Sequence, residues 1–175
     1  YLDYKSGAKL ILNNALERDV INTKGKAYGV EFLYKKPVGK LNGWISYTLM
    51  KATRRFDALN QGEEFAARYD RRHNFNILVN YKISNKMFFS ATWVFNSGFA
   101  YTLPIGIIPS QSSNDPFRDV YIYGARNNRR TQSNHRLDVS MNIKGKPGKI
   151  QTQFSFGIYN AYNQHNPFFI NLALD

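Results

Sequence analysis

The sequence has no cysteine among its 175 residues. Disulfides and thiol-based metal sites are therefore excluded from it. Acidic residues are also scarce, because 12 Asp and Glu stand against 24 Lys and Arg and leave a formal net charge of +12 at pH 7. A basic excess of this size suits an anionic partner such as nucleic acid, lipid phosphates or an acidic ligand.

Long hydrophobic runs are missing as well. No stretch approaches the roughly 18 apolar residues of a transmembrane helix, and the mean hydropathy is negative. Both observations argue against a helical membrane protein. They do not argue against a membrane β-barrel, in which only half of the strand residues face lipid. The first ten residues, YLDYKSGAKL, show no signal-peptide pattern and are typical of the tail of a strand.

Aromatic residues, by contrast, are abundant: they make up 15% of the sequence, with 13 Phe and 12 Tyr. Many lie in segments where apolar and polar residues alternate, and residues 74–81 show this most clearly. The apolar parity there holds Phe75, Ile77, Val79 and Tyr81. The polar parity holds Asn74, Asn76 and Asn80. A period of two at this density predicts a β-strand.

Six segments alternate in this way, and no convincing helical pattern is present. The sequence therefore predicts strands near residues 28–36, 44–51, 73–82, 86–97, 135–144 and 149–160. Short connections that contain the Gly, Pro and Asn of turns separate some of them, at 37–43, 83–85 and 145–148. Long polar segments separate the others, at 52–72, at 97–134 and, we expect, at 5–27.

This arrangement predicts an all-β, antiparallel up-and-down meander with short turns at one end and long loops at the other. Outer-membrane barrels show this asymmetry. Strand length agrees, because about ten residues at roughly 3.4 Å each, tilted by roughly 45°, cover about 24 Å along the membrane normal. Strands of soluble sandwiches are shorter, with about 5–6 residues.

Two interpretations of the alternating faces compete. In a soluble sandwich the apolar face packs on a second sheet, whereas in a membrane barrel it faces lipid. The polar positions are mostly Asn, Ser, Thr and Gln with few charges, which favours a barrel lumen over a solvated surface. Aromatic residues also gather towards the strand ends, at Tyr34, Tyr81, Phe88, Phe89, Trp93, Phe95, Phe99 and Tyr101. Two such girdles are typical of membrane barrels.

Several longer stretches carry a family resemblance. They are GKAYGVEFLYKKPVGKLNGWISYTLMKATRRF, FAARYDRRHNFNI, SATWVFNSGFAYTLP, NHRLDVSMNI and FGIYNAYNQHNPFF. In this order they resemble the C-terminal barrel region of TonB-dependent outer-membrane receptors of the Bacteroidetes type, over nearly the whole chain. The resemblance implies part of a 22-stranded transmembrane barrel with a plugged lumen. It also implies active ligand uptake, driven by the inner-membrane TonB complex.

The sequence departs from a complete receptor, since it contains no plug domain and no TonB-box segment. Its last residues, NLALD, lack the aromatic-ended final strand of such barrels. Six strands cannot close a barrel of this type, and open sheet edges in lipid cost several kcal/mol for each unpaired backbone group. We therefore expect residues 1–175 to be a fragment of one outer-membrane barrel domain, with the plug and final strand lying elsewhere.

The resemblance also implies a location and partners. The location is the outer membrane of a Gram-negative bacterium, in contact with lipid and lipopolysaccharide. Further partners are the plug domain of the same receptor, TonB acting through that plug, a surface lipoprotein, and an imported ligand of unidentified chemistry. No cofactor is expected.

Parity and position predict the roles of individual residues. The lumen-facing set is expected to be Glu31, Ser46, Thr48, Asn74, Asn76, Asn80, Ser90, Thr92, Asn96, Arg136, Asp138, Ser140, Asn142, Gln151 and Gln153. Candidates for contact with lipopolysaccharide phosphates at the rim are Arg71, His73 and His135. The loop YIYGARNNRR offers ligand-binding candidates that suit a glycan or an anionic ligand, namely Tyr121, Tyr123, Arg126, Arg129 and Arg130.

Catalytic and metal sites are not indicated. The stretch YDRRH at 69–73 brings Asp70 and His73 close in sequence, but it also marks the start of a strand, which is the simpler interpretation. The three His residues have no zinc-ligand spacing, and GKPGK at 145–149 lacks the spacing of a phosphate-binding loop. The remaining alternative to a barrel is a soluble basic β-sheet domain that binds nucleic acid or another polyanion by stacking.

Overall fold

The structure is a computed structural model that describes residues 2–4, 20–22, 24–57, 60–108, 120–146 and 150–167. The chain divides into two compact units, which are described separately. The loop unit consists of Tyr1–Tyr28, Lys51–Asp70 and Phe99–Arg130. The sheet unit consists of Gly29–Met50, Arg71–Gly98 and Thr131–Asp175.

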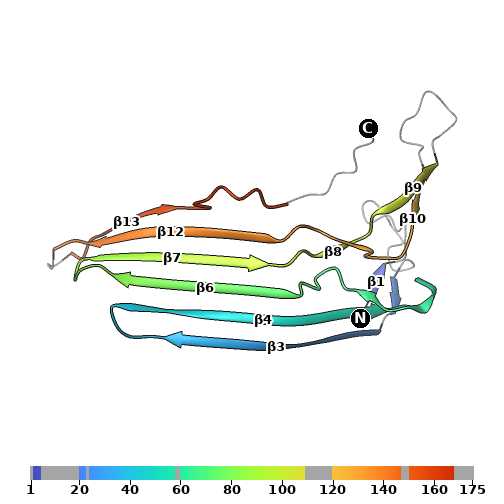
Figure 1. Ribbon diagram of the computed structural model, residues 1–175, viewed down its shortest axis with the longest axis horizontal. Helices are drawn as coiled ribbons and strands as arrows, with labels where there is room; N and C mark the ends of the chain where they lie inside the picture. Colours follow the sequence, from blue (N-terminus) through green and yellow to red (C-terminus); the bar gives the residue numbers. More distant parts are fainter. Residues whose placement is uncertain are drawn as a thin grey trace, which may run out of the picture. The chain divides into compact units, whose positions relative to one another are not determined.

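One antiparallel sheet dominates the fold (Figure 1). Its long strands are β3 (Lys24–Lys36), β4 (Leu41–Arg55), β6 (His73–Lys82), β7 (Met87–Asn96), β12 (Asn134–Lys144) and β13 (Gln153–Ile158). They lie side by side in the order in which they follow along the chain, so the sheet is a meander. Each of the six predicted strands is confirmed as a strand, and the prediction of an all-β meander is confirmed with it. The sheet that the structure describes is open, with β3 and β13 at its edges.

Strand ends shift from the predicted positions for physical reasons. The segment 73–82 has the predicted bounds. Strand β4 extends to Arg55 because its last residues pair with β5 (Phe65–Ala66). Strand β13 stops at Ile158 although the alternation continues to residue 160, because Asn160 adopts a φ of 53° that a strand cannot accommodate.

The segments expected to be long loops contain short strands, which is a correction to the predicted organisation. These strands pair with one another in antiparallel fashion, β1 with β2, β9 with β10 and β8 with β11. They are β1 (Leu2–Tyr4), β2 (Val20–Asn22), β8 (Ala100–Tyr101), β9 (Pro104–Ile108), β10 (Val120–Tyr123) and β11 (Arg129–Arg130). A 3₁₀ turn, η2 (Asn60–Gly62), lies between β4 and β5. Strands of two to five residues are too short to show a clear alternation, so sequence patterning misses them.

Buried side chains occur in the loop unit. They are Ala52, Thr53, Phe56, Phe65, Ala67, Asp70 and Ala100. In the described part of the sheet unit the only buried residue is Gly98, which has no side chain to contribute to a core. The sheet unit is therefore a single layer, and both of its faces remain accessible.

Candidate functional site

The strand register divides the sheet unit into two chemically different faces. Residues directly opposite each other on antiparallel strands project to the same side, so each set of partners across β4, β6, β7 and β12 forms a row. Four rows make up one side, here called the apolar face. They are Leu41–Tyr81–Phe89–Met141, Gly43–Val79–Ala91–Val139, Ile45–Ile77–Trp93–Leu137 and Tyr47–Phe75–Phe95–His135.

The apolar face is banded. Its two middle rows are mainly aliphatic, and the rows on either side are rich in aromatic rings. The row through Tyr47 continues beyond the four strands, because Phe32 of β3 stacks on Tyr47 with 6.3 Å between ring centroids and Tyr162 lies 5.5 Å from His135. Within the row, the Tyr47 and Phe75 centroids are 4.3 Å apart. A continuous line of rings therefore crosses the sheet, which we call the aromatic row.

Polar atoms in the aromatic row are paired with one another. Trp93 Nε1 donates to the Tyr162 hydroxyl at 3.1 Å, and that hydroxyl lies 2.8 Å from His135 Nδ1. The Tyr47 hydroxyl makes the same contact with His73 Nδ1 at 2.9 Å. The side chains of Tyr162 and Tyr47 thus satisfy the polar edges of the indole and imidazoles on an otherwise apolar surface.

No described residue of the sheet unit packs over the apolar face. Exposed fractions are high at its margins and through its middle: 47% for Leu41, 44% for Ile45, 62% for Phe32 and 63% for Phe156. Large contiguous apolar surfaces are rare on soluble monomers, and the rows of this face extend across β4, β6, β7 and β12. The apolar face therefore requires an apolar environment that the sheet unit does not itself supply.

The opposite side, here called the polar face, consists largely of neutral amides and hydroxyls. Three of its rows are Asn42–Asn80–Ser90–Ser140, Ser46–Asn76–Val94–Arg136 and Thr48–Asn74–Asn96–Asn134. Asn80 Nδ2 donates to Asn42 Oδ1 at 3.2 Å, and Ser90 Oγ donates to Asn80 Oδ1 at 2.7 Å. These side chains therefore form a hydrogen-bonded chain across three strands. The row Trp44–Leu78–Thr92–Asp138 interrupts the pattern with two apolar residues.

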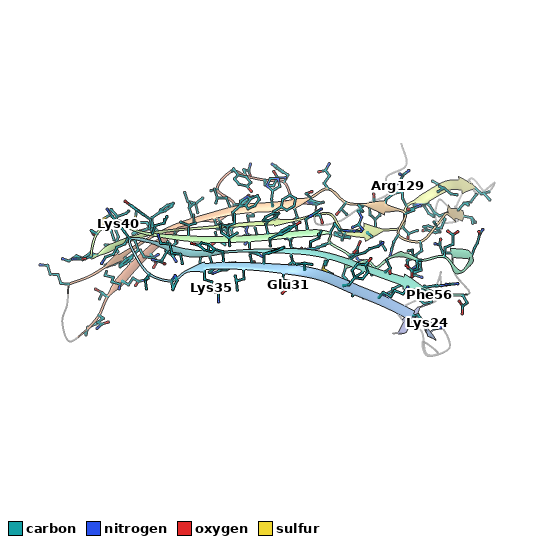
Figure 2. All side chains as sticks on the ribbon, turned by 60° about the horizontal axis from the view of Figure 1, so that its bottom comes forward. Lys24, Glu31, Lys35, Lys40, Phe56 and Arg129 are labelled. Atoms are coloured by element: carbon teal, nitrogen blue, oxygen red, sulfur yellow. The ribbon has the colours of Figure 1, made fainter. Side chains whose placement is uncertain are left out.

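The charges on the polar face are few, and two of them neutralise each other. Arg136 Nε donates a hydrogen bond to Asp138 Oδ2 at 3.0 Å, and a terminal guanidinium nitrogen of Arg136 lies 2.9 Å from the same oxygen. Its guanidinium carbon lies 4.1 Å from the Tyr159 ring centroid, and the Asn160 N–H donates to the other Asp138 oxygen at 2.9 Å. In β3, Glu31 and Lys35 share a parity and project to one side of the strand (Figure 2).

The predicted lumen-facing residues of β4, β6, β7 and β12 all fall on this polar face, as their register shows. Gln153 begins β13 and its amide donates to Asn142 Oδ1 at 3.3 Å. Gln151 precedes β13 and lies outside the regular strand. Which solvent meets the polar face stays a prediction.

The rim candidates lie at the long-connection end of the sheet unit. His73 and His135 belong to the apolar face, where each imidazole contacts a tyrosine hydroxyl as described above. The backbone N–H of His73 also donates to Ser97 Oγ at 2.9 Å. Arg71 lies just before β6, and its carbonyl oxygen accepts a hydrogen bond from Asn74 Nδ2 at 3.1 Å.

The loop unit contains an ion pair that joins a buried carboxylate to an exposed arginine and ties distant segments together. The Asp70 carboxylate is 1% exposed and accepts a hydrogen bond from the Ala52 N–H at 2.6 Å. Arg130 binds the same carboxylate and also the Asp70 carbonyl oxygen. Asp70, which the sequence places within a suggestive YDRRH stretch, is thus an anchor between β4 and β11.

The five ligand-binding candidates do not form a single cluster. Tyr121 and Tyr123 lie on β10, with ring centroids 6.4 Å apart. Arg129 and Arg130 lie on β11, which pairs with β8 instead. Arg126 lies 5.9 Å from the ring centroids of both Phe56 and Phe65, which stack on each other. Arg126 is half-buried, whereas Arg129 and Arg130 are both exposed, and Arg130 contacts Asp70 from the surface of the loop unit.

Other contacts strengthen the same unit. Asn127 Nδ2 donates to the Ala66 carbonyl at 2.7 Å. At the surface, Lys26 Nζ donates to Glu64 Oε1 at 2.9 Å, and this charged hydrogen bond holds the pKa of the Glu64 carboxyl below its usual range. The described parts of the long connections at 52–72 and 97–134 therefore share a small core.

No family model, no curated protein and no solved structure matches this chain. Across the described ranges, no helix is long and apolar enough to cross a membrane. Nor do the described residues include a group of three or more His, Cys, Asp or Glu that could hold a metal ion. The function is therefore inferred from the geometry of the two faces.

Sequence reasoning missed two elements of this geometry. Tyr162 follows β13 and completes the aromatic row, although its only signal in the sequence is its place in the stretch YNAYN. The partnership of Asp70 with Arg130 joins residues 60 positions apart, and nothing local in the sequence indicates it.

Proposed function

We propose that this chain is a barrel segment of a TonB-dependent outer-membrane receptor and takes part in active ligand uptake. The observation that carries the proposal is the uncovered apolar face, with aromatic-rich rows on both sides of an aliphatic band. Lipid chains meet the aliphatic band, and the aromatic rings lie at the two levels where hydrocarbon gives way to headgroups. The family assignment comes from the resemblance of the sequence.

The dimensions of the band support a membrane. Tyr47 lies six residues after Leu41, which corresponds to about 20 Å along the strand at roughly 3.4 Å per residue and to about 14 Å along the membrane normal at a tilt of roughly 45°. The longer run of the ten-residue strands β6 and β7 gives about 24 Å along the membrane normal once a tilt of roughly 45° is applied. An apolar band of about 25 Å is typical of outer-membrane barrels.

The two soluble alternatives fit the faces less well. A sandwich needs a second sheet about 10 Å away over the apolar face, and the described sheet unit supplies none. A nucleic-acid platform interleaves aromatic and basic residues. Here the aromatic row and the outer row through Tyr81 and Phe89 lie on a face whose rows contain neither Lys nor Arg.

In the proposed receptor, the polar face lines the lumen and contacts the plug domain. Its amides and hydroxyls, together with the neutralised Arg136–Asp138 pair, offer hydrogen bonds without a strong fixed charge. Coupling to TonB belongs to the plug. The loop unit faces the cell exterior, where its exposed side chains Tyr123 and Arg129 are available to an incoming ligand or to a surface lipoprotein.

The topology of the proposal is tested by cysteine labelling of the full-length receptor on intact cells. Glu63 lies in the connection that follows β4, and Ser84 lies in the short turn at the opposite strand ends. A membrane-impermeant maleimide is expected to label Glu63→Cys on intact cells and to label Ser84→Cys only after the outer membrane is opened. The reverse pattern would invert the topology, and recovery of the receptor in the aqueous fraction without detergent would refute the barrel.

A second prediction concerns lipopolysaccharide at the rim. Arg71 lies close in sequence to His73, at the end of the apolar face away from the short turns. A guanidinium forms strong, charge-assisted bonds to phosphate. Arg71→Ala is expected to weaken binding of lipid A to the purified receptor severalfold, as measured by native mass spectrometry. Unchanged lipid A binding would count against a rim contact at this residue.

A further inference from the structure

Lysines gather at the end of the sheet unit where the short turns lie. They are Lys35, Lys36, Lys40, Lys82, Lys86, Lys144 and Lys146. Neither Asp, Glu nor Arg occurs in the ranges 34–41, 80–89, 142–146 and 150–153, which make up the described part of this end. The arginines of the sheet unit, Arg71, Arg72 and Arg136, all lie at the opposite strand ends. We call the seven lysines the turn-end cluster.

Backbone pairing holds the members of this cluster close together. The Lys82 N–H donates to the Lys40 carbonyl at 2.7 Å, and the Lys144 N–H donates to the Lys86 carbonyl at 2.8 Å. Neighbouring strands lie about 4.8 Å apart, and like charges at facing positions destabilise a sheet. None of the seven lysines forms an ion pair with another described residue. The fold therefore concentrates positive charge without internal compensation.

The cluster borders the apolar face. Lys40 Nζ lies 5.5 Å from the ring centroid of Tyr81, which belongs to an outer row of that face. Lys144 Nζ lies 4.8 Å from the ring centroid of Phe88, which belongs to the polar face. Lysine stems commonly follow apolar surface while the ammonium group reaches water. Beside these rings lies an open depression of about 530 Å³, lined by Gly39, Lys40, Lys82, Ile83, Ser84 and Asn85.

We infer that the turn-end cluster binds the phosphate headgroups of anionic phospholipids in the leaflet next to the short turns. The inference rests on the proposed membrane location. Its basis is the uncompensated cluster at the strand ends, where Lys40 lies beside Tyr81 at the border of the exposed apolar face. A phospholipid likewise carries its phosphate next to its hydrocarbon chains. A soluble polyanion would engage the lysines but leave the adjoining face bare.

The choice of lysine also fits a fluid leaflet. An ammonium group is a compact point charge on a flexible stem, whereas a guanidinium favours fixed, two-pronged contacts. Each lysine near an anionic membrane surface adds attraction that falls off within a Debye length. The cluster therefore enriches anionic lipids around this part of the barrel, and this enrichment is sensitive to salt.

The test uses the full-length receptor reconstituted in phosphatidylcholine bilayers with trace spin-labelled lipids. The measured quantity is the relative association of phosphatidylglycerol over phosphatidylcholine with the protein surface. One variant replaces Lys40, Lys82, Lys86 and Lys144 with Gln. The matched control removes the same number of charges from the loop unit, by replacing Lys24, Lys51, Arg68 and Arg129 with Gln.

The wild type and the control variant are expected to prefer phosphatidylglycerol severalfold, and the turn-end variant is expected to show a ratio near 1. Salt at about 1 M, where the Debye length is about 3 Å, should bring the wild type to the same ratio. Equal preference in both variants would overturn the inference, as would loss in the control alone. Competition by soluble polyphosphate to the same extent as by lipid vesicles would assign the cluster to a soluble polyanion instead.

A folding assay and a smaller variant separate a failure of the inference from a failure of the proposed function. Heat-dependent gel mobility reports whether each variant has folded and inserted. If the quadruple variant does not insert, the pair Lys40→Gln and Lys82→Gln is measured in its place, and an unchanged ratio would then overturn the inference. Failure of the wild type itself to insert would refute the barrel, whereas insertion without lipid preference would refute only the turn-end cluster.

Discussion

Ile77→Arg is expected to block outer-membrane assembly of the full-length receptor, whereas Asn76→Arg is expected to permit it. The two residues are neighbours near the middle of β6, so they share a depth in the bilayer. Ile77 lies between Ile45 and Trp93 on the apolar face, while Asn76 lies on the polar face. An arginine that faces lipid at this depth costs about 2–4 kcal/mol, and an arginine in a polar lumen costs less. Folded receptor in outer-membrane fractions is the measurement.

A soluble core would also reject Ile77→Arg, so a second substitution separates the two environments. In a packed core, Ile77→Ala typically costs about 2–5 kcal/mol because it leaves a cavity. At a lipid-facing site acyl chains refill the space, and the loss in unfolding free energy should be smaller. A large loss for Ile77→Ala, together with a chain that stays soluble without detergent, would favour a sandwich.

Asp70→Ala and Arg130→Met are both expected to unfold the loop unit locally. Asp70→Ala removes the acceptor of the Ala52 N–H and the anionic partner of Arg130. Arg130→Met removes a cationic partner from a carboxylate that is 1% exposed. Because the Arg130 side chain is 38% exposed, we expect a cost close to that of one hydrogen bond to a charged group, about 1.5–3 kcal/mol. Since each 1.4 kcal/mol is a factor of ten, amide hydrogen exchange at residues 52, 67 and 70 should accelerate by about 10- to 100-fold.

The exposed pair in the same unit provides the control. Glu64→Gln removes the charge that faces Lys26 at 2.9 Å, and exposed ion pairs contribute little because water and salt screen them. Exchange at residues 52, 67 and 70 is expected to stay close to that of the wild type. Equal acceleration in Glu64→Gln and Asp70→Ala would show that the Asp70–Arg130 pair has no special role in holding the unit together.

The sequence by itself determined the strands of the sheet and which side chains share a side within each strand. Both follow from a period of two that neighbouring residues encode, as at Phe75, Ile77 and Val79. The order of the strands was also predictable, because connections such as 83–85 are too short to join anything other than adjacent antiparallel strands. The physical origin of these features is local.

Only the tertiary structure decided how the strands align and what they assemble. Register brings Tyr47, Phe75, Phe95 and His135 into one row, and a shift by one residue on any strand would break it. The two-residue strands of the long connections carry no periodic signal, so they form only because distant partners meet. The pair of Asp70 with Arg130, 60 residues apart, depends on the same long-range closure. Such contacts are set by the free energy of the whole assembly and leave no mark in the sequence near either residue.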